Sequence, residues 1–160
     1  MTREDRLQLI AQYDDGYRAV AEALSGIDDE QLDARPAPGK WSAREVVHHL
    51  ADSEMTAAIR LRLLLAVDHP PIYGFDQDTF ARRLFYDRPI AASLDAFKAA
   101  RLATAEILKR MSDADWQRPG SHTEHTGNYT PERWLEIYAP HAQRHAEQII
   151  VARGAAGKTT

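Results

Sequence analysis

The sequence predicts an all-α protein with the architecture of a four-helix bundle. Apolar residues recur every three or four positions in four long segments, and strand-like alternation of apolar and polar residues is nearly absent. Amphipathic helices without a sheet bury their apolar stripes against one another. We therefore expect residues 1–153 to form a single four-helix-bundle domain with long connections between helices two and three and between helices three and four. Residues 154–160 are expected to be a disordered tail.

The first two helices have clear boundaries in the sequence. The first is predicted from about Arg3 to Leu24, and Gly26 ends it because glycine tolerates a left-handed turn. Its stripe comprises Leu7, Ile10, Tyr13, Tyr17, Val20 and Leu24. The second begins at Ser42, because "SARE" has the form of a capping box that satisfies unpaired amide donors. It runs to about Val67, where the prolines of "DHPP" stop it.

The second half of the chain contains the other two helices. A long connection, Asp68–Pro89, contains "DQDTFARRLF", which predicts a short helix. The third helix is expected over roughly Ile90–Met111, with Leu94, Phe97, Leu102, Ala105 and Leu108 facing inward. The polar segment "SDADWQRPGSHTEHTGNYT" has little helix signal. The fourth helix is expected to start with Thr130 as cap and Pro131 at the first position, and to end before Gly154.

Composition limits the possible classes of function. A 160-residue chain with 44% hydrophobic and 28% charged residues is typical of a folded globular domain. The net charge of -4, with both signs interspersed, argues against sequence-independent nucleic-acid binding. The absence of cysteine excludes disulfides, thiolate metal ligands and a cysteine nucleophile. Because the N-terminus lacks the apolar run of a signal peptide and no run is long enough to span a bilayer, we expect a cytoplasmic protein without a membrane partner.

Two histidines on the fourth helix are candidate metal ligands. At about 100° per residue, His141 and His145 fall on the same stripe as Trp134, Tyr138 and other apolar residues, so they face the bundle interior. Burying two imidazoles without partners costs free energy, and charging both adds repulsion. Two interpretations are open: hydrogen-bonded structural histidines, or a pair of ligands that converge on one divalent cation.

The second helix offers the third ligand of such a site. Its segment "REVVHHLADSE" contains His48 and His49, and its apolar stripe is made of Val46, Leu50, Ala57, Leu61 and Leu64. A helical wheel places His49 about 100° and His48 about 160° from the centre of that stripe. His49 therefore reaches the interior from the edge, where Ser53, Thr56 and Arg60 supply a polar flank. The alternative is that both histidines lie on a solvated edge.

The pairing of "KWSAREVVHHLADSE" with the distant "YAPHAQRH" resembles the DinB superfamily, and within it the YfiT-like branch, over roughly residues 24–150. The resemblance implies a four-helix bundle, often a homodimer, in which three histidines hold one divalent metal ion, nickel or zinc. Carried over residue by residue, it implies His49, His141 and His145 as ligands. The similarity of this branch to bacillithiol S-transferases implies transfer of an exogenous low-molecular-weight thiol to a small-molecule substrate. Other relatives are described as hydrolases.

Three protein ligands leave a coordination position for water or substrate, as in catalytic metal sites. Asp52 is a candidate to orient that ligand or accept a proton, or else forms a salt bridge. Tyr138 is a candidate donor to a bound oxyanion, although core packing explains it equally well. Arg60 is a candidate for binding a substrate or cofactor carboxylate, with a surface position as the alternative.

Other histidine patterns narrow the functional hypotheses. "HAQRH" has the histidine spacing of a metalloprotease motif, but Ala142 replaces the general-base glutamate. His122 and His125 lie in the polar segment, where they are extra ligands, a lid, or exposed loop residues. The sequence thus predicts a metal-dependent thiol transferase or hydrolase. The alternative is a non-catalytic helical protein that binds metal or acts in a stress response.

Overall fold

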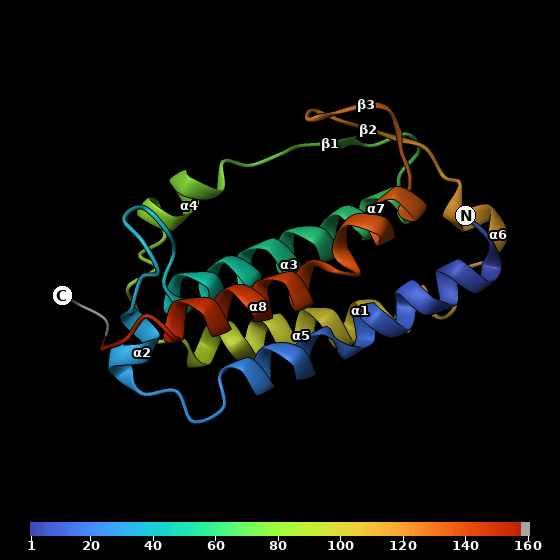
Figure 1. The fold of residues 1–160 in the computed structure, drawn as a ribbon. Coiled ribbons are helices and arrows are strands. Elements are labelled where there is room, and N and C mark those ends of the chain that lie inside the picture. Colours follow the sequence, from blue (N-terminus) through green and yellow to red (C-terminus); the bar gives the residue numbers. More distant parts are fainter. Residues whose placement is uncertain (158–160) are drawn as a thin grey trace.

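The computed structural model describes residues 1–157 and contains the predicted four-helix bundle (Figure 1). Its long helices are α1 (Arg3–Ala23), α3 (Ala43–Ala66), α5 (Ala91–Leu108) and α8 (His141–Arg153), the last preceded by α7 (Pro131–Tyr138). Both α1 and α3 pack against α5 and α8, so α1 and α3 occupy opposite corners of the bundle. No helix within the described residues is both long and apolar enough to cross a membrane.

The predicted helix starts are confirmed by their capping bonds. The hydroxyl of Ser42 accepts from the amide of Glu45, and the Glu45 carboxylate accepts from the amide of Ser42 at 2.9 Å. At α7 the hydroxyl of Thr130 accepts from the amide of Arg133, and Pro131 occupies the first helical position. The first helix ends at its predicted place, and Gly26 has a φ of 65°. The local sequence therefore determines where these helices begin and where α1 ends.

The prediction of one continuous fourth helix is wrong. The helix is interrupted at Ala139 and Pro140, and α8 restarts at His141. Proline has no amide hydrogen and its ring clashes with the preceding turn, so it breaks a helix interior. The break places His141 at the first position of α8, with only His145 one full turn inside the new helix.

Short helices occur in the connections. The helix predicted within the long connection is confirmed as α4 (Gln77–Arg83). Two further short helices, α2 (Asp29–Asp33) and α6 (Asp113–Trp116), were not predicted. The α2 and α6 segments each have a reciprocal capping box at their start. Helices of four or five residues have too few turns to show an apolar period, so capping was their only local signal.

A small sheet was also missed by the sequence prediction. Its strands are β1 (Pro71–Ile72), β2 (Gly120–His122) and β3 (His125–Tyr129), in the order β1-β2-β3. The first pair is parallel and the second is antiparallel. Figure 1 shows this sheet lying over the α3–α7 side of the bundle. Because β1 pairs with a strand some fifty residues away, chain folding rather than local alternation creates it.

The core consists of two apolar clusters with a polar layer between them. One cluster contains Tyr13 and Trp134, and the other contains Val20 and Ile149. Along α1, α3 and α5, the residues between the clusters include Gly16, Glu54 and Arg101, respectively. The break between α7 and α8 falls in the same layer. The bundle is therefore not uniformly apolar in cross-section.

Two predicted inward residues are in fact exposed. Leu7 is 58% exposed and Leu102 is 50% exposed, so neither belongs to the buried face of its helix. At the C-terminal end, residues 154–157 form turns, with the amide of Ala155 bonded to the carbonyl of Ala152. The rest of the predicted tail, residues 158–160, lies outside the described residues.

Candidate metal centre

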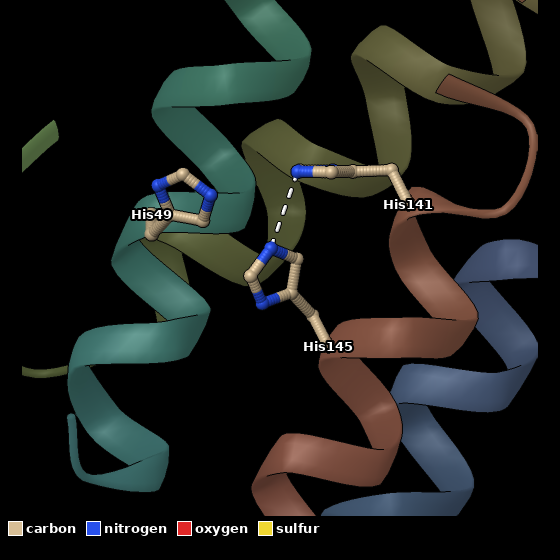
Figure 2. Close-up of side chains that lie close together, drawn as sticks. All are labelled: His49, His141 and His145. Atoms are coloured by element: carbon tan, nitrogen blue, oxygen red, sulfur yellow. Dashed lines mark hydrogen bonds between the residues drawn. The ribbon is translucent and has the colours of Figure 1, made fainter. Parts of the chain in front are cut away.

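Three histidines from two helices converge at one point in the bundle. His49 comes from α3, whereas His141 and His145 come from α8, and Figure 2 shows the three rings facing one another. One ring nitrogen from each lies within 4.8 Å of the others. The Nε2 atoms of His141 and His145 are 3.2 Å apart. This spacing allows three nitrogens to coordinate one ion after small side-chain adjustments.

The polar layer fixes the two helices that carry these histidines. The Arg101 guanidinium donates to the carbonyls of Tyr138 and Ala139 at 3.3 and 3.5 Å, and these are carbonyls that the helix break deprives of intrahelical partners. It also donates to the carbonyl of Tyr13 at 2.6 Å and pairs with Glu54 at 2.5 Å. Arg101 thereby ties α3 to the break between α7 and α8.

Burial keeps all three imidazoles neutral at neutral pH. Desolvation, followed by the charge of His145, lowers the pKa of His49 to about 3. Desolvation is also the main reason that the pKa of His141 is lowered strongly and that of His145 is lowered. Neutral imidazole is the form that binds metals, so few protons compete with a cation at pH 7.

The hydrogen bonds around the cluster fit a metal site. The Nδ1 atom of His49 is buried without a hydrogen-bond partner, which is unusual for a buried polar atom. The Nδ1 atom of His145 lies 2.8 Å from Oε1 of Gln148. Because this oxygen can only accept, Nδ1 carries the proton and the lone pair of Nε2 points toward His141. The residues present therefore fit a divalent cation with an affinity for imidazole.

The cluster opens into a cavity of about 330 Å³. The predicted polar flank supplies Ser53 and Arg60 to its wall. Thr56 instead donates to the carbonyl of Asp52 on its own helix. The wall comprises His49, Ser53, Arg60, Phe75, Gln77, Glu124, Ile137, Tyr138, His141 and His145. A small molecule in this cavity would lie against all three imidazoles.

The three candidate residues other than the metal ligands have different surroundings. Arg60 is only 8% exposed, so its alternative surface position is wrong. Tyr138 is buried and lines the cavity, with its ring centroid 5.9 Å from that of His141. Asp52 does not belong to the cavity wall, and its carboxylate accepts from the hydroxyl of Tyr86 at 2.7 Å. No salt bridge of Asp52 occurs among the residues that the structure describes, so that alternative is wrong as well.

The remaining histidines lie outside the cluster. His48 and His49 are both buried, so the alternative of a solvated edge is wrong. His48 bonds to Ser93 and to the carbonyl of Arg88, because the first turn of α5 and the connection before it cover this side of α3. His122 is buried on β2, contrary to the exposed-loop interpretation, whereas His125 is exposed.

Sequence reasoning missed several residues around the site. Gln148 carries a usable local signal, because a residue three positions after His145 lies on the same face of a helix. Glu54 and Arg101 carry no such signal, since their pairing joins two helices. Glu124 reaches the cavity from the turn between β2 and β3, so its position depends on the unpredicted sheet.

Fold and site together define a helical-bundle protein with a three-histidine cluster beside a cavity. The chain belongs to the DinB superfamily, whose family model matches residues 12–149. A protein of Oceanobacillus iheyensis is 33% identical over 140 residues, covering 88% of this chain and 81% of its own length. One from Geobacillus thermodenitrificans is 31% identical over 154 residues, covering 94% and 85%. Both are named "putative metal-dependent hydrolase".

The fold matches a solved structure over most of its length. YfiT from Bacillus subtilis is described as "a probable metal-dependent hydrolase with an unusual four-helix bundle topology". It superposes with a TM-score of 0.88 at 26% identity, covering 96% of this chain and 89% of YfiT. The resemblance inferred from the two histidine motifs is therefore confirmed at the level of family and fold.

Proposed function

We propose that this protein is a divalent-metal-dependent enzyme that acts on a small molecule, with His49, His141 and His145 as the metal ligands. The observation that carries the proposal is the convergence of three neutral imidazoles at the wall of a cavity. A structural metal site is closed by four protein ligands, whereas a catalytic one keeps a position open. Three histidines beside a cavity match the catalytic pattern. Zinc and nickel are the cations that we expect.

A cation bound there would supply Lewis-acid chemistry and favour the deprotonated form of a water or thiol at neutral pH. The chain's own residues orient the reactants. Gln148 holds His145 in the tautomer that presents Nε2. The Tyr138 hydroxyl accepts from Arg60 at 2.7 Å, so its own proton is free to be donated to an oxyanion in the cavity. Burial raises the pKa of Tyr138, which keeps that proton in place.

Hydrolysis is the reaction that the relatives' names support. A specific observation also favours thiol transfer as a second candidate. A second hollow of about 230 Å³ includes Trp41 and Gln148 in its wall and shares His145 and Gln77 with the first. Two hollows that meet at one ligand have room for two reactants. Because the chain has no cysteine, the thiol would come from an exogenous low-molecular-weight compound.

Metal analysis of tag-free protein tests the ligand assignment. We expect near-stoichiometric zinc or nickel in the wild type and none in His141→Ala. His125→Ala is the matched control, because His125 is an exposed histidine outside the cluster, and this variant should keep its metal. An absence of metal from the wild type under several loading conditions would contradict the proposal.

Reaction class is tested with the metal-loaded protein and small model compounds. An electrophile incubated with several low-molecular-weight thiols reports transferase activity, and ester and amide substrates report hydrolase activity. Either activity should disappear on chelation and return with metal. Turnover that survives removal of the metal would contradict the proposed role of the cluster. Stoichiometric metal without turnover of either class would favour the non-catalytic metal-binding function.

We also propose that the protein forms a homodimer, as its resemblance to the family implies. Met55, Ile59 and Leu63 form an exposed apolar row along α3, and a second copy is a suitable cover for such a surface. Light scattering should give twice the chain mass for the wild type and a monomer for Ile59→Glu. A dimer that persists in this variant would place the interface elsewhere.

A further inference from the structure

A buried arginine in the cavity wall has no carboxylate partner. Arg60 lies on α3, and its side chain shares the 330 Å³ cavity with the three histidines. Among residues 1–157 it forms no ion pair. A buried cation without a counter-charge is costly, so buried arginines are normally paired. The cost at Arg60 calls for a functional reason.

The groups that contact Arg60 are neutral. One terminal nitrogen donates to the hydroxyl of Tyr138 at 2.7 Å, and the other donates to the backbone carbonyl of Tyr73. Its Cζ atom lies 5.6 Å from the centre of the Phe75 ring. Since a guanidinium has five N–H donors, these two bonds hold the group in place and leave donors for a ligand.

Arg101 provides the internal comparison. It is 2% exposed and also donates to backbone carbonyls, but it has a buried carboxylate partner in Glu54. Arg101 belongs to the polar layer and does not line the cavity. Arg101, in the polar layer, is paired with a carboxylate of the chain, whereas Arg60, in the cavity wall, is not.

Nearby titratable groups do not supply the missing charge. Burial raises the pKa of Tyr138 and of Tyr129, so both hydroxyls stay neutral. Burial, and then the charge of Arg60, lowers the pKa of His122, which stays neutral too. Glu124 is the one carboxylate in the cavity wall, and it is exposed and not ion-paired with Arg60. An anion from outside the chain can therefore meet an uncompensated positive charge.

We propose that Arg60 binds a carboxylate group of the small molecule on which the histidine cluster acts, so that the substrate class is a small carboxylic acid. A planar guanidinium matches a carboxylate with two parallel hydrogen bonds. Tyr138 lies between the two parts of the site, since its hydroxyl contacts Arg60 and its ring faces His141. The reaction rests on the proposed function, whereas carboxylate binding itself needs no metal.

Binding of a matched pair of probes to chelator-treated protein tests this proposal. Benzoate and benzamide have nearly the same shape but differ in charge, and calorimetry at pH 7.5 compares their binding. We expect benzoate to bind and benzamide to bind at least tenfold more weakly, from the strength of charge-assisted hydrogen bonds. Equal binding of the two probes would overturn the proposal without requiring any variant.

Variants then locate the interaction. Arg60→Gln should weaken benzoate binding at least tenfold, and Arg60→Lys should weaken it less, because the charge remains and the planar fork is lost. Arg62→Gln is the matched control, since Arg62 is an exposed arginine on the same helix outside the cavity, and it should bind benzoate as the wild type does. Unchanged binding in Arg60→Gln, or an equal loss in Arg62→Gln, would overturn the assignment.

Two further experiments distinguish carboxylate binding at Arg60 from metal binding and from the binding of other anions. Arg60→Gln should lose benzoate binding but keep the metal content of the wild type, because Arg60 is not one of the three ligands, so failure of the metal site and failure of the Arg60 site give different results. Inorganic phosphate should bind more weakly than benzoate, because one guanidinium does not neutralise a doubly charged anion. Tighter phosphate binding that depends on Arg60 would replace the carboxylate assignment with a phosphate one.

Discussion

Removal of Arg101 is the most direct test of how the bundle holds its metal-binding helices in place. In Arg101→Met, Glu54 keeps a carboxylate that is 1% exposed and has lost its counter-charge. The carbonyls of Tyr138 and Ala139 lose a donor at the helix break. Breaking a buried ion pair by removing one partner costs about 3 to 5 kcal/mol. Domains of this size are stable by about 5 to 15 kcal/mol, so the variant should be near its stability limit.

Urea denaturation of the metal-free protein, followed by circular dichroism, measures this loss. The double variant Arg101→Met with Glu54→Leu should recover about 2 kcal/mol or more, because the uncompensated charge is gone. The double variant should not regain the full stability of the wild type, since the carbonyls of Tyr138 and Ala139 remain without their donor. Arg18→Met is the matched control: Arg18 pairs with Asp15 and Glu22 on the surface, where solvent screens the pairs, and its removal should leave the urea midpoint nearly unchanged.

The pH dependence of the same experiment gives a second check. Burial raises the pKa of Glu54, so the folded state holds this proton more tightly than the unfolded chain does. Without Arg101 the pKa of Glu54 in the folded state rises further. Above about pH 4.3 the unfolded chain therefore loses the Glu54 proton before the folded protein does. The difference in the free energy of unfolding between wild type and Arg101→Met should therefore become smaller as the pH falls toward 5. A single-variant loss below about 1 kcal/mol, or a double variant less stable than the single one, would refute the reasoning.

Three more perturbations test the site and its supports. In Gly16→Ala, the new methyl would lie 2.7 Å from Cβ of Ala142, and such overpacking should lower the urea midpoint by the equivalent of about 1 to 3 kcal/mol; an unchanged midpoint would contradict the tight packing. His49 has a folded-state pKa of about 3 and an unfolded one near 6.5, so the unfolded state binds more protons in between. Neutral His49 should thus contribute fully to the free energy of unfolding of the metal-free protein above pH 6.5. Below pH 6.5 this free energy should fall by about 1.4 kcal/mol per pH unit. A free energy of unfolding that stays constant from pH 6.5 to 5 would count against burial of a neutral His49. Gln148→Leu removes the acceptor that orients His145 and should weaken metal affinity about 10- to 100-fold in a competition titration with a chelator, whereas unaltered affinity would show that the hydrogen bond is dispensable.

The sequence determined the features that depend on neighbouring residues. The Ser42 capping box, the Thr130 cap with Pro131, and the apolar period predicted where α3 and α7 start, and the wheel selected His49 over His48 as the residue that joins the cluster. The period also placed His141 and His145 on one stripe, and this remains valid despite the break. Side chains one turn apart on a helix share a face, whatever the rest of the chain does.

Tertiary structure alone decided the features that join distant segments. The pairing of β1 with β2, the burial of His48 beneath the connection before α5, and the Arg101–Glu54 pair all require segments that are far apart in sequence. Pro140 is a local signal for the helix break. The way in which the freed carbonyls are satisfied had no such signal, because their donor is Arg101 on another helix. The unpaired charge of Arg60 was likewise visible only in the folded chain. A residue's charge can be read from the sequence, but whether that charge is compensated depends on what the fold places beside it.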